Sequence, residues 1–271
     1  MPSKDAPTPW QLRIFQKTLK KKLRIKALAK HIGELADNQR CLLVTCGDNN
    51  GAINYLLKSR GAKWSWADLE IQGIPEMADF LGDPVFHAKE DHLPFDDCRF
   101  DCVLSVDVQE HLNDPNPFTS ELRRVTKKGG KVIVTVPNGD DTKPVVRLKR
   151  LVGMTNDVYG HCRTGFTIEE LSRLLSANGI HPKAASSFSQ GFTELLELFV
   201  NYGYVKILSK RSRAKVEKGT IAPSTKNQLK SVHRMFRVYS VLYPFCWTIS
   251  RLDILFSGSV GYVIIVEGRK A

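Results

Sequence analysis

Two histidines and two carboxylates stand where they could act on a substrate. His111 and His161 each follow a short valine-rich run that indicates a buried strand. An imidazole titrates near neutral pH, so either ring is a candidate to take the proton of a hydroxyl group. Asp107 and Glu110 share the predicted loop of His111 and are candidates to bind an amino group or an acceptor. The alternative for His111 is a structural role, in which it caps a helix or bonds the backbone.

A turn rich in glycine and asparagine is the second candidate site. The apolar run Cys41–Thr45 is followed at once by Gly47-Asp48-Asn49-Asn50-Gly51. Such a turn permits close approach of the backbone to a ligand, although it also begins helices that bind nothing. Asp68 ends the next predicted strand, where an acidic side chain would hold two ribose hydroxyls. Together these features indicate a nucleoside-bearing ligand.

The elements that must position these residues alternate between strand and helix. We predict strands at residues 41–45, 63–67, 84–88, 100–106, 131–136, 184–188 and 261–267, and helices at 10–32, 118–125 and 167–178. Gly129 and Gly130 are predicted to stop the second helix, and a polar loop should follow Pro137. The alternation predicts an α/β fold with a Rossmann-like, mostly parallel seven-stranded sheet covered by helices on both faces. Ligands of such sheets lie beyond the carboxyl ends of the central strands.

We expect four parts along the chain. They are a basic amphipathic N-terminal helical segment (1–40), a core (41–188), a helical insertion rich in basic and aromatic residues (189–260), and a last strand with a tail (261–271). An insertion of this length between neighbouring strands is usually functional.

The net charge of +12 is unevenly placed. Residues 1–40 carry a net +7 and residues 204–237 a net +9, whereas residues 41–203 carry −5. These basic segments suit an anionic membrane surface or a nucleic acid, and a plain solvated helix face is the third interpretation. Tyr239, Tyr243 and Trp247 are residue types that insert among lipid headgroups, which favours the membrane.

Cysteine usage and hydropathy exclude other classes. The six cysteines have no paired spacing, so we expect neither a disulfide framework nor a metal site, and a reducing cytoplasm. The N-terminus lacks the apolar core of a secretory signal. The apolar run 238–256 contains Arg251 and Asp253, so we do not predict a membrane span.

A succession of short motifs carries a family resemblance. In order they are His92–Asp97 (HLPFDD), Phe100–Val103, Glu110–Pro115, Glu121–Val125, Lys128–Gly130 and Val136–Asn138. Over roughly residues 42–180 this succession resembles the class I S-adenosylmethionine-dependent methyltransferases, in the type 11 branch grouped with the ubiquinone and menaquinone methyltransferases. The later run Tyr159–Thr167 is similar to a segment of bacterial enzymes, many of which act in lipid and surface-glycan biosynthesis.

The resemblance implies S-adenosylmethionine as cofactor and assigns residues to it. The first family motif, an acidic residue and three alternate glycines, falls on Thr45, Gly47, Asn49 and Gly51. Asn49 tolerates the left-handed conformation better than most residues, so the turn is expected to survive. The family's acidic residue near the adenine falls on a lysine, for which Glu90 or Asp91 would substitute.

The expected function is methyl transfer to a small lipophilic, lipid-linked or glycan acceptor, as O-methylation. Transfer needs alignment of the acceptor and removal of its proton, and His111 or His161 would be the base. Arg163 would bind a carboxylate or phosphate of the acceptor, or else form a surface salt bridge. The alternatives are a nucleic-acid-binding protein or RNA/DNA methyltransferase, and a fold that binds the cofactor without catalysis. We expect a cytoplasmic protein with peripheral contact at the inner face of the membrane.

Overall fold

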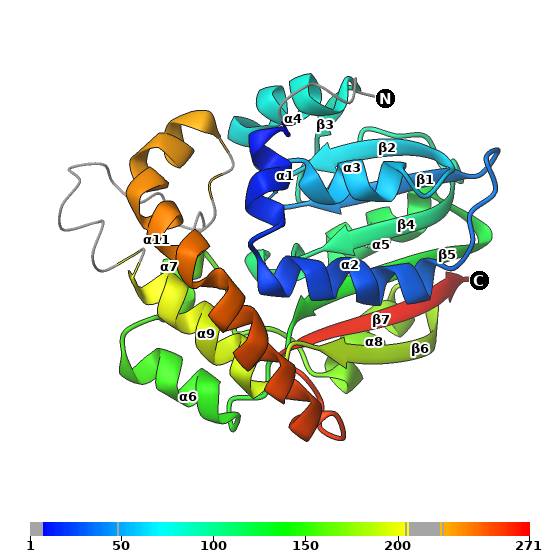
Figure 1. Cartoon of the computed structure of the whole chain (residues 1–271). Coiled ribbons are helices and arrows are strands. Elements are labelled where there is room, and N and C mark those ends of the chain that lie inside the picture. Colours follow the sequence, from blue (N-terminus) through cyan, green and yellow to red (C-terminus); the bar gives the residue numbers. More distant parts are fainter. Residues whose placement is uncertain (1–7, 48, 204, 206–222, 224) are drawn as a thin grey trace.

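A computed structural model describes residues 8–47, 49–203, 205, 223 and 225–271. Its strands are β1 (Arg40–Thr45), β2 (Lys63–Asp68), β3 (Val85–His87), β4 (Phe100–Val106), β5 (Thr126–Pro137), β6 (Ile180–Phe188) and β7 (Val263–Lys270). They form one sheet in the order β3-β2-β1-β4-β5-β7-β6 (Figure 1). The pairs from β3 to β5 are parallel, and β7 runs antiparallel between β5 and β6. The predicted fold class is confirmed.

Both faces of the sheet are buried, because successive apolar residues of a strand face opposite layers of helices. In β1, Leu42 and Val44 face one layer while Cys41 and Leu43 face the other. The first layer contains α5 (Asn116–Val125) and α8 (Ile168–Ala177), and the second contains α2 (Leu19–Ile32), α3 (Ala52–Lys58) and α4 (Ile74–Leu81). Figure 1 shows α2 and α3 in front of the sheet, with α5 and α8 behind it.

The N-terminal segment folds as two helices rather than the single one predicted. α1 (Trp10–Phe15) ends before α2 begins, because the backbone of Thr18 is extended and its hydroxyl donates to the carbonyl of Phe15. Trp10 and Leu28, one from each helix, are both buried.

Two sequence predictions near the centre of the chain are wrong. The predicted loop after Pro137 contains α6 (Pro144–Leu151) and α7 (Asn156–Tyr159). α5 ends at Val125 without help from glycine, since β5 begins at the next residue and includes Gly129 and Gly130. Two short 3₁₀ turns, η1 (Ile71–Gly73) and η2 (Gln109–His111), lie in loops after β2 and β4.

The insertion between β6 and β7 forms a helical layer at one end of the sheet. It contains α9 (Gly191–Tyr202), α11 (Lys226–Ser250) and the 3₁₀ segment η4 (Arg251–Phe256). The Asp253 carboxylate accepts hydrogen bonds from the backbone of Gln190, Phe192 and Thr193, so η4 caps the N-terminus of α9. In the described part of the chain, no helix combines the length and the apolar character needed to cross a bilayer. Most of the basic stretch 204–237, namely 204, 206–222 and 224, lies outside the described residues.

Candidate functional site

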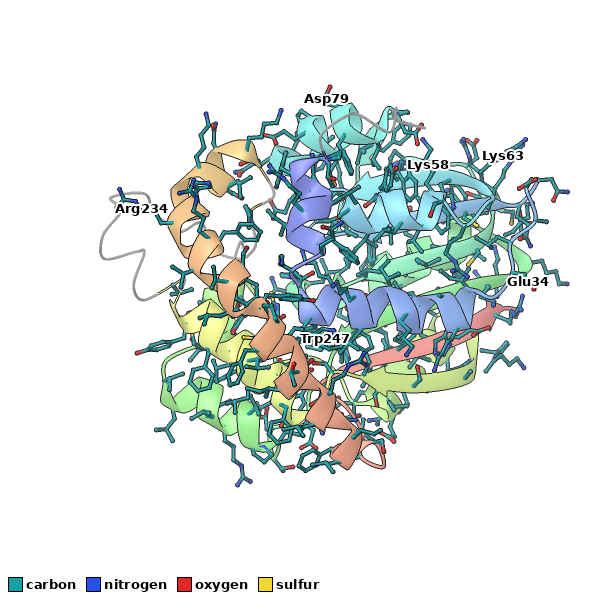
Figure 2. The ribbon with its side chains drawn as sticks, viewed as in Figure 1. Glu34, Lys58, Lys63, Asp79, Arg234 and Trp247 are labelled. Atoms are coloured by element: carbon teal, nitrogen blue, oxygen red, sulfur yellow. The ribbon has the colours of Figure 1, made fainter. Side chains whose placement is uncertain are left out.

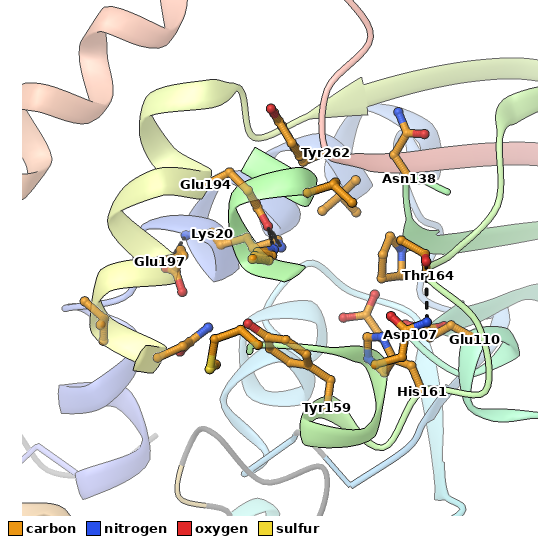
Figure 3. Close-up of a pocket in the computed structure, with 18 of the residues that line it drawn as sticks. Lys20, Asp107, Glu110, Asn138, Tyr159, His161, Thr164, Glu194, Glu197 and Tyr262 are labelled. Atoms are coloured by element: carbon orange, nitrogen blue, oxygen red, sulfur yellow. Dashed lines mark hydrogen bonds and ion pairs between the residues drawn. The ribbon is translucent and has the colours of Figure 1, made fainter. Parts of the chain in front are cut away.

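A pocket of about 740 Å³ opens beyond the carboxyl ends of β4 and β5. Side chains from α1, α2, α6, α7, α9 and α11 form its other walls, so the insertion and the N-terminal helices cover the sheet end together. Figure 3 shows Asp107, Glu110 and His161 gathered at one side, and Lys20, Glu194 and Glu197 at another. The pocket therefore lies where the fold predicts a ligand.

Backbone contacts between two distant loops bring His111 and His161 together. The ring of His111 contacts the Gly160 carbonyl through Nδ1, at 3.0 Å. The N–H of Cys162 donates to the Glu110 carbonyl at 2.9 Å, and its thiol contacts the His111 carbonyl at 3.0 Å. The two imidazole rings are perpendicular, with centroids 4.7 Å apart. Each histidine is thus held in place by the loop that carries the other.

Gly165 belongs to the loop that carries His161, and it lets this loop lie directly against the end of β5. A Cβ at this position would lie 2.0 Å from the Pro137 oxygen, and φ is +149°. Phe166 exchanges backbone hydrogen bonds with Pro137 and Gly139 on either side of this contact. Only glycine allows so close an approach, so the position of His161 depends on it.

The histidines adjoin a carboxylate with no partner. Glu110 is 1% exposed, and its Oε2 has no hydrogen-bond partner among the described residues. Burial, together with the nearby charge of Asp107, raises the pKa of Glu110 well above its ordinary value. Burial and the neighbouring His111 lower the pKa of His161 to about 3, so its imidazole is neutral at physiological pH.

Asp107 leaves β4 in an uncommon backbone conformation. Its φ is +51°, and its backbone N–H donates to the Thr135 carbonyl. One carboxylate oxygen forms an ion pair with Arg24 of α2. The other oxygen and the Arg24 Nε are buried and have no partner within the described part of the chain. The pair therefore presents one free acceptor and one free donor at the pocket wall.

The predicted turn after β1 forms, but Asn49 acts differently from the expectation. The left-handed conformations fall on Gly47 (φ +68°) and Gly51 (φ +87°). Asn49 instead ties the turn through its side chain, which accepts from the Gly51 N–H and donates to Thr45 and Asn54. The side-chain amide of Asn49 thus fixes the conformation of the turn at the position where the family has its middle glycine.

Asp68 faces inward, and this corrects its predicted role as a ribose ligand. Its side chain is fully buried. Oδ1 accepts from the N–H groups of Gly47 (2.9 Å) and Glu70 (2.8 Å), while Oδ2 accepts from the Thr45 hydroxyl at 2.5 Å. The carboxylate of Glu70 is exposed beside Gly47 and is the accessible acid at this strand end.

The charges of four carboxylates act on Cys46, the residue that follows β1. Burial and the charges of Asp68, Glu70, Glu110 and Glu90 raise the pKa of its thiol. The carboxyl ends of strands β1 to β4 therefore form an acidic region, which we call the acidic mouth. It consists of Asp68, Glu70, Glu90 and Glu110. Asp91 is exposed in the turn that joins Lys89 to His92, and no contact with another described residue places it in the acidic mouth.

Arg163 lies outside the pocket lining and takes neither of its predicted roles. Its guanidinium donates to the Asn113 carbonyl at 3.0 Å and stacks over the Phe166 ring at 4.9 Å. It therefore braces the loop of His161 against the loop of His111.

The sequence did not reveal a second charged cluster in the pocket. Glu194 of α9 forms ion pairs with Lys149 (2.5 Å) and Lys20 (3.1 Å), and its carboxylate also accepts from Ser189. Burial alone would raise the pKa of Glu194, but the two lysines outweigh it and bring the value to about 2. A buried glutamate in an apolar helix pattern was the one available signal, because such a charge needs partners.

Comparison with known proteins identifies the fold. Residues 44–134, about a third of the chain, match the model of a methyltransferase domain family of type 11. An uncharacterized protein of Methanocaldococcus jannaschii is 49% identical over 49 residues, which are 18% of this chain and 21% of that protein. The match thus spans about a fifth of that relative's length.

Two solved structures share the fold at low identity. A SAM-dependent methyltransferase from Thermotoga maritima superposes with a TM-score of 0.53 at 18% identity, over 96% of this chain and 94% of that one. A geranyl diphosphate C-methyltransferase from Streptomyces coelicolor, in complex with Mg²⁺, geranyl-S-thiolodiphosphate and S-adenosyl-L-homocysteine, gives 0.51 at 13% identity, over 92% and 75%.

The chain therefore has the Rossmann-like α/β fold that these methyltransferase structures share. The match at residues 44–134 supports the type 11 methyltransferase family and, with it, the S-adenosylmethionine cofactor that the motifs indicated.

Proposed function

We propose that the chain transfers the methyl group of S-adenosylmethionine to a hydroxyl of a lipophilic or lipid-linked acceptor at a membrane surface. The observation that carries this proposal is the pocket of about 740 Å³, whose lining combines apolar side chains with two buried carboxylate oxygens, one of Asp107 and one of Glu110, that have no partner among the described residues. S-adenosylmethionine supplies an activated methyl group on a sulfonium, so the protein has to hold it and align the acceptor.

The unpartnered atoms fit the charged parts of the cofactor. Asp107 Oδ1 is a free acceptor for the ammonium of the methionine end, and Arg24 Nε is a free donor for its carboxylate. The acidic mouth around Cys46 favours the positive sulfonium. Gly47 and Glu70 would contact the nucleoside. Asp68 would hold the turn in place by accepting the hydrogen bond from the Gly47 N–H.

The lining indicates an amphiphilic acceptor. The apolar part of the pocket wall includes Ile14, Val146, Met154, Phe236 and Tyr239. Basic and acidic side chains are balanced in the lining, five of each, so charge does not select a polyanion. A lipophilic body would lie against the apolar walls while its hydroxyl meets Glu110, His111 and His161.

The outer face of α11 supports a membrane location. Phe236 and Tyr239 line the pocket, while Val241 (80% exposed), Leu242 (52%) and Phe245 (67%) of the same helix face outward. A helix with one face on an acceptor pocket and an apolar face outside suits the headgroup layer. Arg234 and Trp247 extend from this helix too (Figure 2). We place the protein in the cytoplasm, peripherally at the inner face of the membrane.

Tyr243 does not take the interfacial role predicted for it. It is 8% exposed, and Lys22 of α2 donates to its hydroxyl at 2.8 Å. The ammonium of Lys17 lies 5.0 Å from its ring centroid. Tyr243 thus joins the insertion to the N-terminal helices, and the outward residues of α11 replace it as membrane contacts.

Incubation with labelled S-adenosylmethionine and fractionated cell extract tests the proposal. We expect label in the lipid fraction with the wild type, and at least about a 10-fold loss with Asp107→Asn. Asp96→Asn, an exposed carboxylate outside the site, is the matched control. Label in the RNA or DNA fraction instead would establish the nucleic-acid alternative. Cofactor binding with no labelled fraction would favour a fold without catalysis.

A further inference from the structure

Glu110, His111 and His161 together have the geometry of a cation site. One potential ligand atom from each lies within 4.8 Å of those of the other two. Two of the ligands come from η2, and the third comes from the loop after α7. All three residues line the pocket, so a bound ion would be reachable from the acceptor space.

The unpartnered Glu110 oxygen is a second, independent observation. Glu110 is almost fully buried, yet its Oε2 has no hydrogen bond in the described structure. Buried carboxylate oxygens in folded proteins nearly always have a partner, and burying one without a partner is costly. A cation between Glu110 and the histidines would supply that partner.

The orientation of His111 suits a ligand. The Gly160 carbonyl can only accept, so the Nδ1 of His111, 3.0 Å away, carries the proton and donates it. In the neutral imidazole, Nε2 then has a lone pair for a metal. Metal-binding histidines are commonly fixed in this way, by a backbone carbonyl on the other ring nitrogen.

We propose that Glu110, His111 and His161 bind one divalent transition-metal cation. Two imidazoles and a carboxylate suit Zn²⁺, Mn²⁺, Fe²⁺ or Co²⁺. Three protein ligands leave coordination positions open toward the pocket, as in catalytic rather than structural sites. The ligands lie in two loops about 50 residues apart, so no short ligand spacing in the sequence indicates the site, and the prediction was that no metal binds.

The role of the cation in the reaction rests on the proposed function. The acceptor hydroxyl would approach an open coordination position, where the positive charge lowers its pKa. Its proton would pass to solvent. The oxygen then forms a bond to the methyl carbon as the carbon–sulfur bond breaks, which leaves a neutral thioether and the methyl ether.

Titration with Co²⁺ tests the site directly, with the full chain and without acceptor. We expect one Co²⁺ per chain and visible absorption bands that report histidine coordination. Glu110→Gln and His161→Asn should each weaken binding by at least about 10-fold. His92→Asn, an exposed histidine 3.8 Å from Glu121, is the matched control and should bind as the wild type does. Circular dichroism of each variant checks that it is folded.

The possible results separate the site from the reaction. If the wild type binds no Co²⁺ at millimolar concentration, or if all variants bind equally, the site is disproved. Co²⁺ binding without any methylated fraction would keep the site and refute the proposed function. Methyl transfer that survives a chelator, and is lost in His111→Asn, would leave His111 as a metal-free base.

Discussion

Asp68 holds the turn after β1 through three hydrogen bonds, so its loss should act on stability first. Asp68→Ala leaves two N–H groups and a hydroxyl unpaired, and we expect a loss of roughly 2–4 kcal/mol. Thermal unfolding and calorimetry with S-adenosylmethionine measure the two effects. Glu70→Ala should leave the melting temperature unchanged and lower cofactor affinity by about 10-fold. An Asp68→Ala protein with normal stability and no cofactor binding would restore Asp68 as a direct ligand.

The Arg24–Asp107 pair should recognise the amino-acid end of the cofactor. Arg24→Ala and Asp107→Asn are expected to weaken S-adenosylmethionine binding by about 10-fold or more, because each removes a charge-assisted hydrogen bond. Methylthioadenosine lacks the amino-acid end, so its affinity should not change.

Calorimetry with both ligands checks this assignment. Equal weakening for the two ligands would mean that the pair supports the pocket wall and does not contact the methionine group. Arg40→Ala, whose residue lies at the opposite end of β1, is the control.

The sequence predicted which residues lie at the site better than it predicted where their side chains point. Asp107, Glu110, His111 and His161 were chosen because they follow central strands, and all four line the pocket. Asp68 was placed at the correct strand end, but its inward direction depends on Thr45 and the bent backbone at Gly47. Such tertiary hydrogen bonds leave no mark in the spacing of residues.

At the scale of elements, Glu194 connects three helices. It joins α9 to Lys20 of α2 and Lys149 of α6 from a side chain that is 2% exposed. The pKa of Glu194 is lowered to about 2 in the folded state, against about 4.3 in an unfolded chain. Its stabilising contribution is therefore complete above about pH 4.3 and is lost as the pH falls toward 2.

Denaturant unfolding between pH 7 and pH 2 measures this contribution. The wild type should lose about 3 kcal/mol from this group across that window, in addition to the common acid effects. Glu194→Gln should be less stable at pH 7, because Lys20 and Lys149, which are partly buried, lose their ion pairs with Glu194. Its stability should also change less with pH below pH 4.3. Glu169→Gln in the exposed first turn of α8 is the control. Parallel curves for wild type and Glu194→Gln would contradict the assignment.

Strands were easier to predict than helices in this chain. β4 was predicted with its exact bounds, since its buried run is continuous and apolar. α6 was missed because Val145 and Val146 are its only buried residues, and they face α9 and the pocket instead of the sheet.

At the scale of the whole molecule, the added helices decide where the chemistry can occur. The sheet supplies the strand ends, but α2, α6, α9 and α11 enclose the acceptor space above them (Figure 1). Because α11 lines this space and also has an exposed apolar face, the acceptor could enter from a surface that α11 touches. The sequence indicated a functional insertion from its length, and the pairing of Lys22 with Tyr243 shows how the N-terminal helices join it.

Membrane binding should therefore depend on the outward face of α11. Liposome flotation measures it, and we expect the wild type to float with anionic vesicles and less with neutral ones. Leu242→Asp with Phe245→Asp should lower the partition by at least about 10-fold, since each inserted apolar side chain contributes about 1.5–3 kcal/mol. Ile71→Asp, which changes an equally exposed apolar residue of η1, is the control.

A second set of variants separates charge from apolar contact. Lys210, Arg211, Arg213 and Lys215 lie outside the described residues, and changing all four to glutamate should abolish the preference for anionic vesicles while the apolar face of α11 is intact. If neither set alters flotation, or if the protein binds no vesicle and is retained on RNA or DNA in a salt-sensitive way, the membrane assignment fails. The basic segments would then belong to a nucleic-acid surface, because release of counterions from phosphates would account for the salt dependence.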